Sequence, residues 1–228
     1  MTDQRLTMSP EAIAAEQQGF MVKVFGWMGG GQLVSGLVAT WVATNVGFIG
    51  MGTFIVAAVI QLVVVIGLVS RVERMSATMA TGLFIFYSAL TGVTLSTLLL
   101  IYTAESVAST FVITAGVFGV MAFYGYTTKK DLTGWGSFLF MGLIGIILAS
   151  VVNMFMRSSA MGMVISYVGV LIFTGLTAYD VQKIKSKNVL GNAGTDEDTK
   201  EAVIGALALY LDFINLFIML LRITGSRR

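Results

Sequence analysis

Residues 201–222 read EAVIGALALYLDFINLFIMLLR and contain the most informative part of the chain. The apolar run from 202 to 221 is long enough to cross the hydrocarbon core of a bilayer, which takes ~20 helical residues. Asp212 lies near the middle of this run, where an ionised carboxylate costs at least ~2.5 kcal/mol. Asn215 follows three residues later and shares a helix face with it. We therefore expect a membrane helix inside a bundle, with Asp212 turned toward protein, water or an ion.

The composition is that of an integral membrane protein. Of the 228 residues, 56% are hydrophobic and only 11% are charged, whereas soluble proteins carry roughly 25% charged residues. The chain has no Cys and no His, which excludes a disulfide, a thiol nucleophile, a histidine-containing triad and histidine-ligated zinc. Proton sensing must therefore depend on carboxylates. We expect the lipid bilayer as the main partner, no nucleic acid, no bound cofactor and no enzymatic activity.

Apolar windows predict an all-α chain with seven spanning helices, whose short connections place successive helices antiparallel in one bundle. The predicted spans are 20–43, 49–70, 77–101, 106–126, 136–156, 160–182 and 202–222. A cytosolic tail is predicted over 1–19, with a helix start at Ser9-Pro10. One membrane domain follows over 20–223, and a short C-terminal tail over 224–228. The longest connection, 183–200, is predicted to be a solvated linker.

Small residues at a spacing of four predict close helix contacts in two spans. Gly26 and Gly30 form such a pair in the first span, and Ala115 and Gly119 form another in the fourth. Trp41 and Trp135 fall near span ends, where amphipathic rings favour the membrane interface.

Positive charge predicts the orientation of the bundle. Ten of the 14 Lys and Arg residues, Arg5 among them, fall on the side of the N-terminus, which places that terminus in the cytoplasm. The other four are Arg157, Arg222, Arg227 and Arg228. Seven spans put the C-terminus outside, where Arg227 and Arg228 run against the trend. A re-entrant last segment would remove this conflict, so the side of the C-terminus stays open.

A second carboxylate, Asp180, ends the sixth span in FTGLTAYDVQKIKSK. It is either an interfacial carboxylate neutralised by Lys183 at i+3, or it lines one cleft together with Asp212. Depth opposes the second interpretation, because Asp212 lies ~15 Å inside its span and Asp180 lies near a boundary. The two meet only if a helix tilts or starts deeper, or if water enters.

If the two aspartates do meet, they form a pH switch without histidine. Like charges in a poorly solvated site do not both ionise cheaply, so the pair shares a proton and titrates as a unit. Its oxygens suit Ca²⁺, although two carboxylates fall short of the usual six to eight ligands. Arg71 and Arg74 lie on the same predicted side and either anchor to lipid headgroups or bond to Asp180.

Two other classes of membrane protein also use paired aspartates. Tyr179-Asp180 resembles half of the intramembrane aspartyl protease signature, but Leu209-Tyr210-Leu211-Asp212 replaces the required GxGD. The Pro-Ala-Leu element is impossible because Pro10 is the only proline. A proton-coupled transporter would use the carboxylates as a relay, but it would usually carry repeats or broken helices, and neither is found in the sequence.

Three segments form a distinctive set of motifs: GYTTKKDLTGWGSFLFMGLIG at 125–145, FTGLTAYDVQKIK at 173–185 and ALALYLDFINLFIMLLRI at 206–223. Together they resemble the Bax inhibitor-1 family of transmembrane proteins, and its bacterial inner-membrane branch most closely. The likeness extends across all seven spans.

The resemblance implies a seven-helix bundle in which the last helix is central and the other six surround it. It also implies a pH-sensitive calcium leak, with Asp180 and Asp212 as the two-aspartate sensor and ion-binding pair. Arg74 corresponds best to the family's latch arginine, and Arg71, one turn away, is the alternative. Some bacterial relatives engage a membrane protease, so a non-conducting regulator of such a complex is the leading alternative function.

Overall fold

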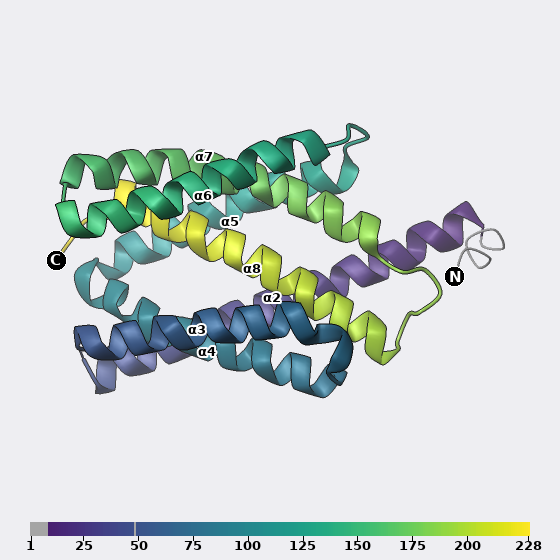
Figure 1. The fold of residues 1–228 in the computed structure, drawn as a ribbon, viewed down its shortest axis with the longest axis horizontal. Coiled ribbons are helices and arrows are strands. Elements are labelled where there is room, and N and C mark those ends of the chain that lie inside the picture. The colour runs from purple at the N-terminus through teal and green to yellow at the C-terminus, as the bar shows by residue number, and fades with distance from the viewer. Residues whose placement is uncertain (1–8, 48) are drawn as a thin grey trace. The chain divides into compact units, whose positions relative to one another are not determined.

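The computed structural model describes residues 9–47 and 49–228, and over these it contains helices and connections but no β-strand. The predicted all-α class is confirmed (Figure 1). The elements are α2 (Pro10–Asn45), α3 (Met51–Arg71), the short 3₁₀ helix η1 (Val72–Arg74), α4 (Ala77–Ile101), α5 (Ala104–Thr127), α6 (Thr133–Met156), α7 (Ser159–Lys187) and α8 (Asp196–Thr224). Six helices, α3 to α8, are long and apolar enough to cross a membrane, and α2 covers the first predicted span.

The first described helix begins where the sequence predicts. The Ser9 hydroxyl accepts the Ala12 N–H at 3.2 Å, and Pro10 occupies the first turn, where a missing N–H costs nothing. The helix then continues without a break past residue 20, so the predicted boundary between tail and membrane domain does not coincide with a helix end. Arg5 and the rest of residues 1–8 lie outside the described part of the chain.

The chain divides into two compact units. Unit 1 holds the described part of Met1–Ile101 together with Lys185–Tyr210, and unit 2 holds Tyr102–Ile184 together with Leu211–Arg228. Each unit takes one portion of α7 and of α8, because both divisions fall inside helices. The single membrane domain predicted over 20–223 stays a prediction.

Helices α2 and α4 pack closely in unit 1 at two glycines. A Cβ atom at Gly31 would lie 2.7 Å from the Phe84 ring, and one at Gly92 would lie 2.6 Å from the Ser35 carbonyl oxygen. The predicted contact pair Gly26 and Gly30 is wrong, because neither has a described atom within 4 Å of such a Cβ position. Gly30 and Gly31 point in directions ~100° apart, as adjacent residues of a helix do. The four-residue spacing of small residues therefore did not identify the helix face that contacts α4.

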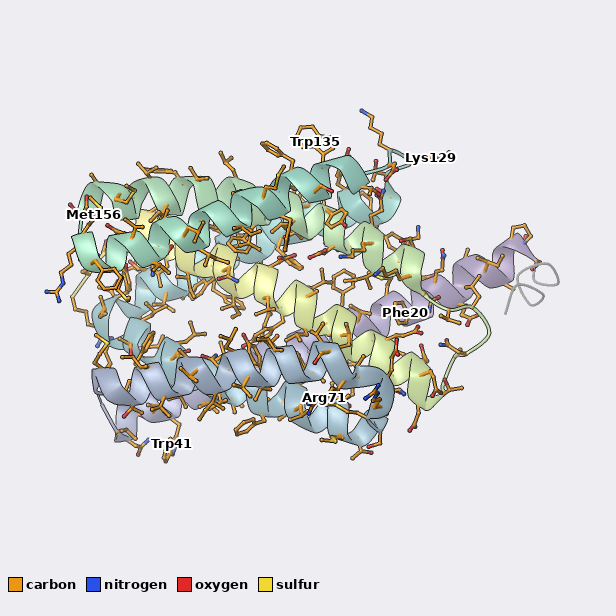
Figure 2. All side chains as sticks on the ribbon, viewed as in Figure 1. Phe20, Trp41, Arg71, Lys129, Trp135 and Met156 are labelled. Carbon is orange, nitrogen blue, oxygen red and sulfur yellow. The ribbon has the colours of Figure 1, made fainter. Side chains whose placement is uncertain are left out.

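The pair predicted in the fourth span is wrong for the same reason. Ala115 is exposed, and a Cβ at Gly119 would meet no described atom within 4 Å. Both residues lie on an open face of α5. Trp41 and Trp135 are 61% and 64% exposed and point away from neighbouring helices (Figure 2). Their position at the membrane interface stays a prediction.

Tyr210 anchors the first half of α8 in unit 1. Its ring makes edge-to-face contacts with Phe84 and Tyr87, at centroid distances of 5.8 and 6.0 Å. Its hydroxyl lies 2.6 Å from Ser35 Oγ, which also lies 2.7 Å from the Ser88 carbonyl. The Ser35 hydrogen is directed to a backbone carbonyl, so Tyr210 donates to Ser35.

The predicted linker over 183–200 is largely helical, because α7 continues to Lys187 and α8 begins at Asp196. Asp198 is buried and accepts hydrogen bonds from Lys23 and from the Gly194 N–H. The prediction of a solvated linker is therefore wrong at Asp198. Acidic residues in the first turn of a helix are stabilised by the helix dipole. The contact between Asp198 and Lys23, 175 residues away, could not be predicted from the local sequence.

Unit 2 contains α5, α6, most of α7 and the second half of α8. Phe213 packs edge-to-face against Phe111 and Phe118 of α5. The C-terminal end is also fixed within this unit, since the Thr103 N–H donates to the Ser226 carbonyl at 3.0 Å. Helix α8 is continuous to Thr224, so it ends beside the start of α5 rather than turning back.

Candidate functional site: a buried aspartate pair

Unit 2 brings Asp180 of α7 and Asp212 of α8 together. Their carboxyl groups lie within hydrogen-bonding reach of each other. Asp212 is only 5% exposed, and Asp180 is half-buried. Two acidic groups from consecutive apolar helices therefore meet where water is scarce.

The lengths of the two helices explain how the two aspartates come together. The predicted spans placed Asp212 deep in the membrane and Asp180 near its boundary, which opposed such a contact. Helix α7 ends at Lys187 rather than at residue 182, which moves Asp180 to ~10 Å inside its helix. The Val189 N–H lies 3.4 Å from a Glu201 carboxylate oxygen, so the turn between the helices sits beside residue 201. Asp212 is ~16 Å along α8 from that level. The difference that remains, ~6 Å, is within the reach of tilt and side-chain length.

Lys183 acts electrostatically on Asp180 from the same helix. Its ammonium group also lies 5.3 Å from the centroid of the Tyr179 ring, a cation–π arrangement at i, i+4. The sequence predicted the spacing to Asp180 but missed the aromatic partner, although the i, i+4 spacing was visible. One lysine offsets the charge of one carboxylate and not of two.

The hydrogen bonding around Asp212 favours a shared proton. Across residues 9–47 and 49–228, its Oδ2 atom has no conventional hydrogen-bond donor. The Asn215 amide, on the same helix face, donates to the Leu211 carbonyl at 2.8 Å instead. Two carboxylates only accept hydrogen bonds, so a proton between Asp180 and Asp212 supplies the missing donor.

The remaining predicted site residues belong to unit 1. Arg71 ends α3, Arg74 ends η1, and both side chains are exposed. A latch between Arg74 and Asp180 would join residues of different units, and it stays a prediction. Within the described residues, no group of three acidic, His or Cys side chains is placed to hold a metal ion. A cation at Asp180 and Asp212 would thus need further oxygen ligands that are not carboxylates.

Several apolar helices with an acidic pair between two of them define a multi-pass α-helical membrane protein. Comparison with known proteins specifies the class, because the family described as "Inhibitor of apoptosis-promoting Bax1" matches residues 17–228. The chain belongs to this family, the Bax inhibitor-1 family, as its motifs predict.

Bacterial relatives match over nearly the whole chain. "Inner membrane protein YbhL" of Escherichia coli K12 is 49% identical over 217 residues, which cover 92% of this chain and 93% of that protein. An uncharacterized protein of Borreliella burgdorferi is 47% identical over 228 residues and 98% of both chains. Protein RP147 of Rickettsia prowazekii is 44% identical over 216 residues, 92% of this chain and 90% of its own. The apolar helices and the first relative support a multi-pass inner-membrane location.

Proposed function

We propose that this protein is a pH-sensitive cation leak, with Ca²⁺ as the transported ion, gated by the Asp180–Asp212 pair. The observation that supports this most directly is the contact of two carboxyl groups from consecutive apolar helices in a buried site. Such groups are costly in a membrane and are usually retained for ion or proton chemistry. The proposed activity is transport and not catalysis.

The proposal includes a seven-span topology with α8 at the centre. Helix α2 is 36 residues long, ~54 Å, which is sufficient to span with length to spare. In α8, 61% of the most apolar window is buried, against at most 39% in the other candidate spans. We place the N-terminus in the cytoplasm because ten of the 14 basic residues fall on that side of a seven-span chain.

The state of the pair with one shared proton is the natural closed state. A hydrogen bond between a carboxylic acid and a carboxylate is charge-assisted, and therefore stronger than a bond between neutral groups. It braces α7 against α8. Removing the proton leaves two repelling carboxylates, and adding a second leaves a weaker neutral pair, so a change of pH in either direction loosens the brace. Arg74 would reinforce the closed state by holding Asp180.

The same groups suit passage of Ca²⁺ better than its storage. Two carboxylates offer at most four oxygens, and Ca²⁺ takes six to eight. An ion bound there would keep part of its hydration shell and would bind weakly enough to leave. Lys183 beside Asp180 lowers the net negative charge and weakens the binding further.

The test is Ca²⁺ flux into liposomes that contain the purified protein, measured with an enclosed indicator over a series of pH values. Asp180→Asn and Asp212→Asn should each abolish the pH dependence, because neither variant can form the carboxyl pair. Glu105→Gln is the matched control, since Glu105 is an exposed carboxylate in the first turn of α5. A wild-type pH response in both aspartate variants would reject the gate.

Two other outcomes would point to the alternative functions. No flux at any pH, together with co-purification of a membrane protease, would favour the non-conducting regulator. Ca²⁺ movement that requires an opposing proton gradient would favour a proton-coupled transporter. Either result would reject the leak while leaving the family assignment intact.

A further inference from the structure

We propose that residues 125–136, GYTTKKDLTGWG, form a clamp that positions Asp180 against Asp212. This α7 clamp comprises the end of α5, the start of α6 and the connection between them, all in unit 2. It holds α7 at Ala178, Tyr179 and Gln182, on both sides of Asp180. The inference rests on the proposed function only in assigning a purpose to the pair, because the contacts exist independently of it.

The first contact joins two backbones. A Cβ atom at Gly125 of α5 would lie 2.2 Å from the Ala178 carbonyl oxygen and 2.9 Å from the Ala178 Cα. Glycine is the one residue that allows so close an approach, which small residues generally provide between membrane helices. Because the obstacle is backbone, a larger residue at Gly125 must move α7 itself two residues before Asp180.

The second contact comes from α6 on the adjacent residue of α7. A Cβ at Gly136 would lie 2.3 Å from two atoms of the Tyr179 ring. The ring therefore occupies the space that Gly136 leaves empty. Tyr179 immediately precedes Asp180 and also contacts Lys183. The packing of its ring against Gly136 therefore fixes the positions of both Asp180 and Lys183.

The third contact ties the connection to α7 after Asp180. Gln182 Oε1 accepts the Leu132 N–H at 2.9 Å, and Gln182 Nε2 donates to the Lys130 carbonyl at 2.8 Å. Both ends of one amide are thus satisfied by the α5–α6 connection. Together with the two glycines, this contact restrains both the rotation and the position of α7 around Asp180.

The clamp acts through position and not through charge. The groups that act electrostatically on Asp180 are Lys183 of α7 and Asp212 of α8. The charged members of the clamp, Lys129, Lys130 and Asp131, are exposed. Displacing the clamp should therefore change the separation of the two carboxyl groups and so their coupling, while leaving the charges of the site as they are.

The principal variant is Gly125→Ala, with Gly119→Ala on the same helix as its matched control, because a Cβ at Gly119 meets nothing within 4 Å. Titration of the two carboxyl groups is measured in liposomes by the infrared C=O stretch of the protonated acid. The band is assigned to the pair because it should be lost in Asp180→Asn and Asp212→Asn. Coupled acids titrate in two separated steps. We expect Gly125→Ala to bring the two titration steps closer together by about one pH unit or more and to flatten the pH profile of the leak. Gly119→Ala should change neither the titration nor the leak.

A second pair of variants keeps the test decisive if Gly125→Ala does not fold. Gly136→Ala should narrow the separation, whereas Gly134→Ala, which has open space at its Cβ position, should not. Combining Gly136→Ala with Tyr179→Ala removes the obstructing ring and should restore part of the separation, because the contacts at Gly125 and Gln182 still hold α7. Combining it with Tyr179→Phe retains the ring and should not restore it. A purely structural role would not distinguish these two double variants.

The outcomes separate the clamp from the leak. A wild-type infrared titration in Gly136→Ala, or in a folded Gly125→Ala, would overturn the clamp, whatever the flux. A wild-type protein without flux whose titration is altered by both clamp variants would support the clamp and reject the leak. A wild-type protein that shows no coupled carboxyl titration would overturn both.

Discussion

Lys23 of α2 donates a hydrogen bond to Asp198 in the first turn of α8, so an ion pair joins two elements that lie 175 residues apart. The Asp198 side chain is 3% exposed and the Lys23 side chain 44%. Glu16 of α2 also accepts the Gly191 N–H, at 2.7 Å. In unit 1, the polar half of α2 thus fastens both the connection before α8 and the start of that helix.

Lys23→Met should destabilise the protein by about 2 kcal/mol, because it leaves the buried Asp198 carboxylate without its cation. The partial exposure of Lys23 keeps the expected loss below that of a fully buried pair. Thermal unfolding in detergent, followed by circular dichroism, measures it. Lys200→Met is the control, since its partner Glu197 lies 3.5 Å away and is 67% exposed. Equal losses in both variants would contradict a special role for Lys23.

Tyr210→Phe should cost about 1 kcal/mol, the typical value of one hydrogen bond. The variant retains the aromatic contacts with Phe84 and Tyr87 and removes the donor that Ser35 accepts. The same unfolding measurement applies, and Tyr167→Phe, at a tyrosine that is 55% exposed, should be neutral. If the two phenylalanine variants unfold alike, the Tyr210 hydroxyl does not contribute.

Gly92→Ala should destabilise unit 1 by about 1–3 kcal/mol, because the added methyl group would meet the Ser35 carbonyl at 2.6 Å and force α2 and α4 apart. Gly82→Ala, on the same helix but with open space, should be neutral or stabilising by up to about 1 kcal/mol, since alanine favours a helix over glycine. Opposite signs in the two unfolding temperatures are the expected result. A stable Gly92→Ala would mean that the helices separate without cost.

Asp131 gives a pH dependence outside the membrane spans. The hydrogen bond from the Thr133 hydroxyl, and then that from the Thr133 N–H, hold the pKa of Asp131 below its usual value. Because the pKa is lowered in the folded state, the ionised Asp131 side chain stabilises the fold at pH values above the ordinary aspartate pKa. This stabilisation is lost as the pH falls through the lowered pKa. The stability difference between wild type and Asp131→Asn should therefore be constant above about pH 5 and shrink in acid.

Thr133→Val is the companion variant, because it removes the hydrogen bond with the largest effect on the Asp131 pKa. In this variant the pKa of Asp131 lies nearer its ordinary value, so the stability that Asp131 contributes, and therefore loses in acid, should be smaller than in the wild type. Unfolding temperatures recorded from neutral pH into acid would follow the change. If the unfolding temperature falls in acid as it does in the wild type, the hydrogen bond from the Thr133 N–H alone keeps the pKa of Asp131 low.

The motifs predicted the pair of aspartates but not what holds it. Asp180 and Asp212 were recognisable because a carboxylate stands out in an apolar helix. Gly125 and Gly136 were not, because a glycine that admits a neighbouring backbone has the same appearance in the sequence as Gly119 or Gly134, which face open space. The wrong choice of Gly26 and Gly30 has this same origin.

By itself, the sequence determined that the chain is an all-α membrane protein with two acidic residues in its apolar helices, because hydrophobic length and intramembrane charge are properties of single segments. Only the tertiary structure decided that Asp180 meets Asp212, that Lys23 reaches Asp198, and which glycines lie at helix contacts. These outcomes depend on the end of each helix, its tilt and the face it turns to its neighbours. The packing of several segments sets all three at once.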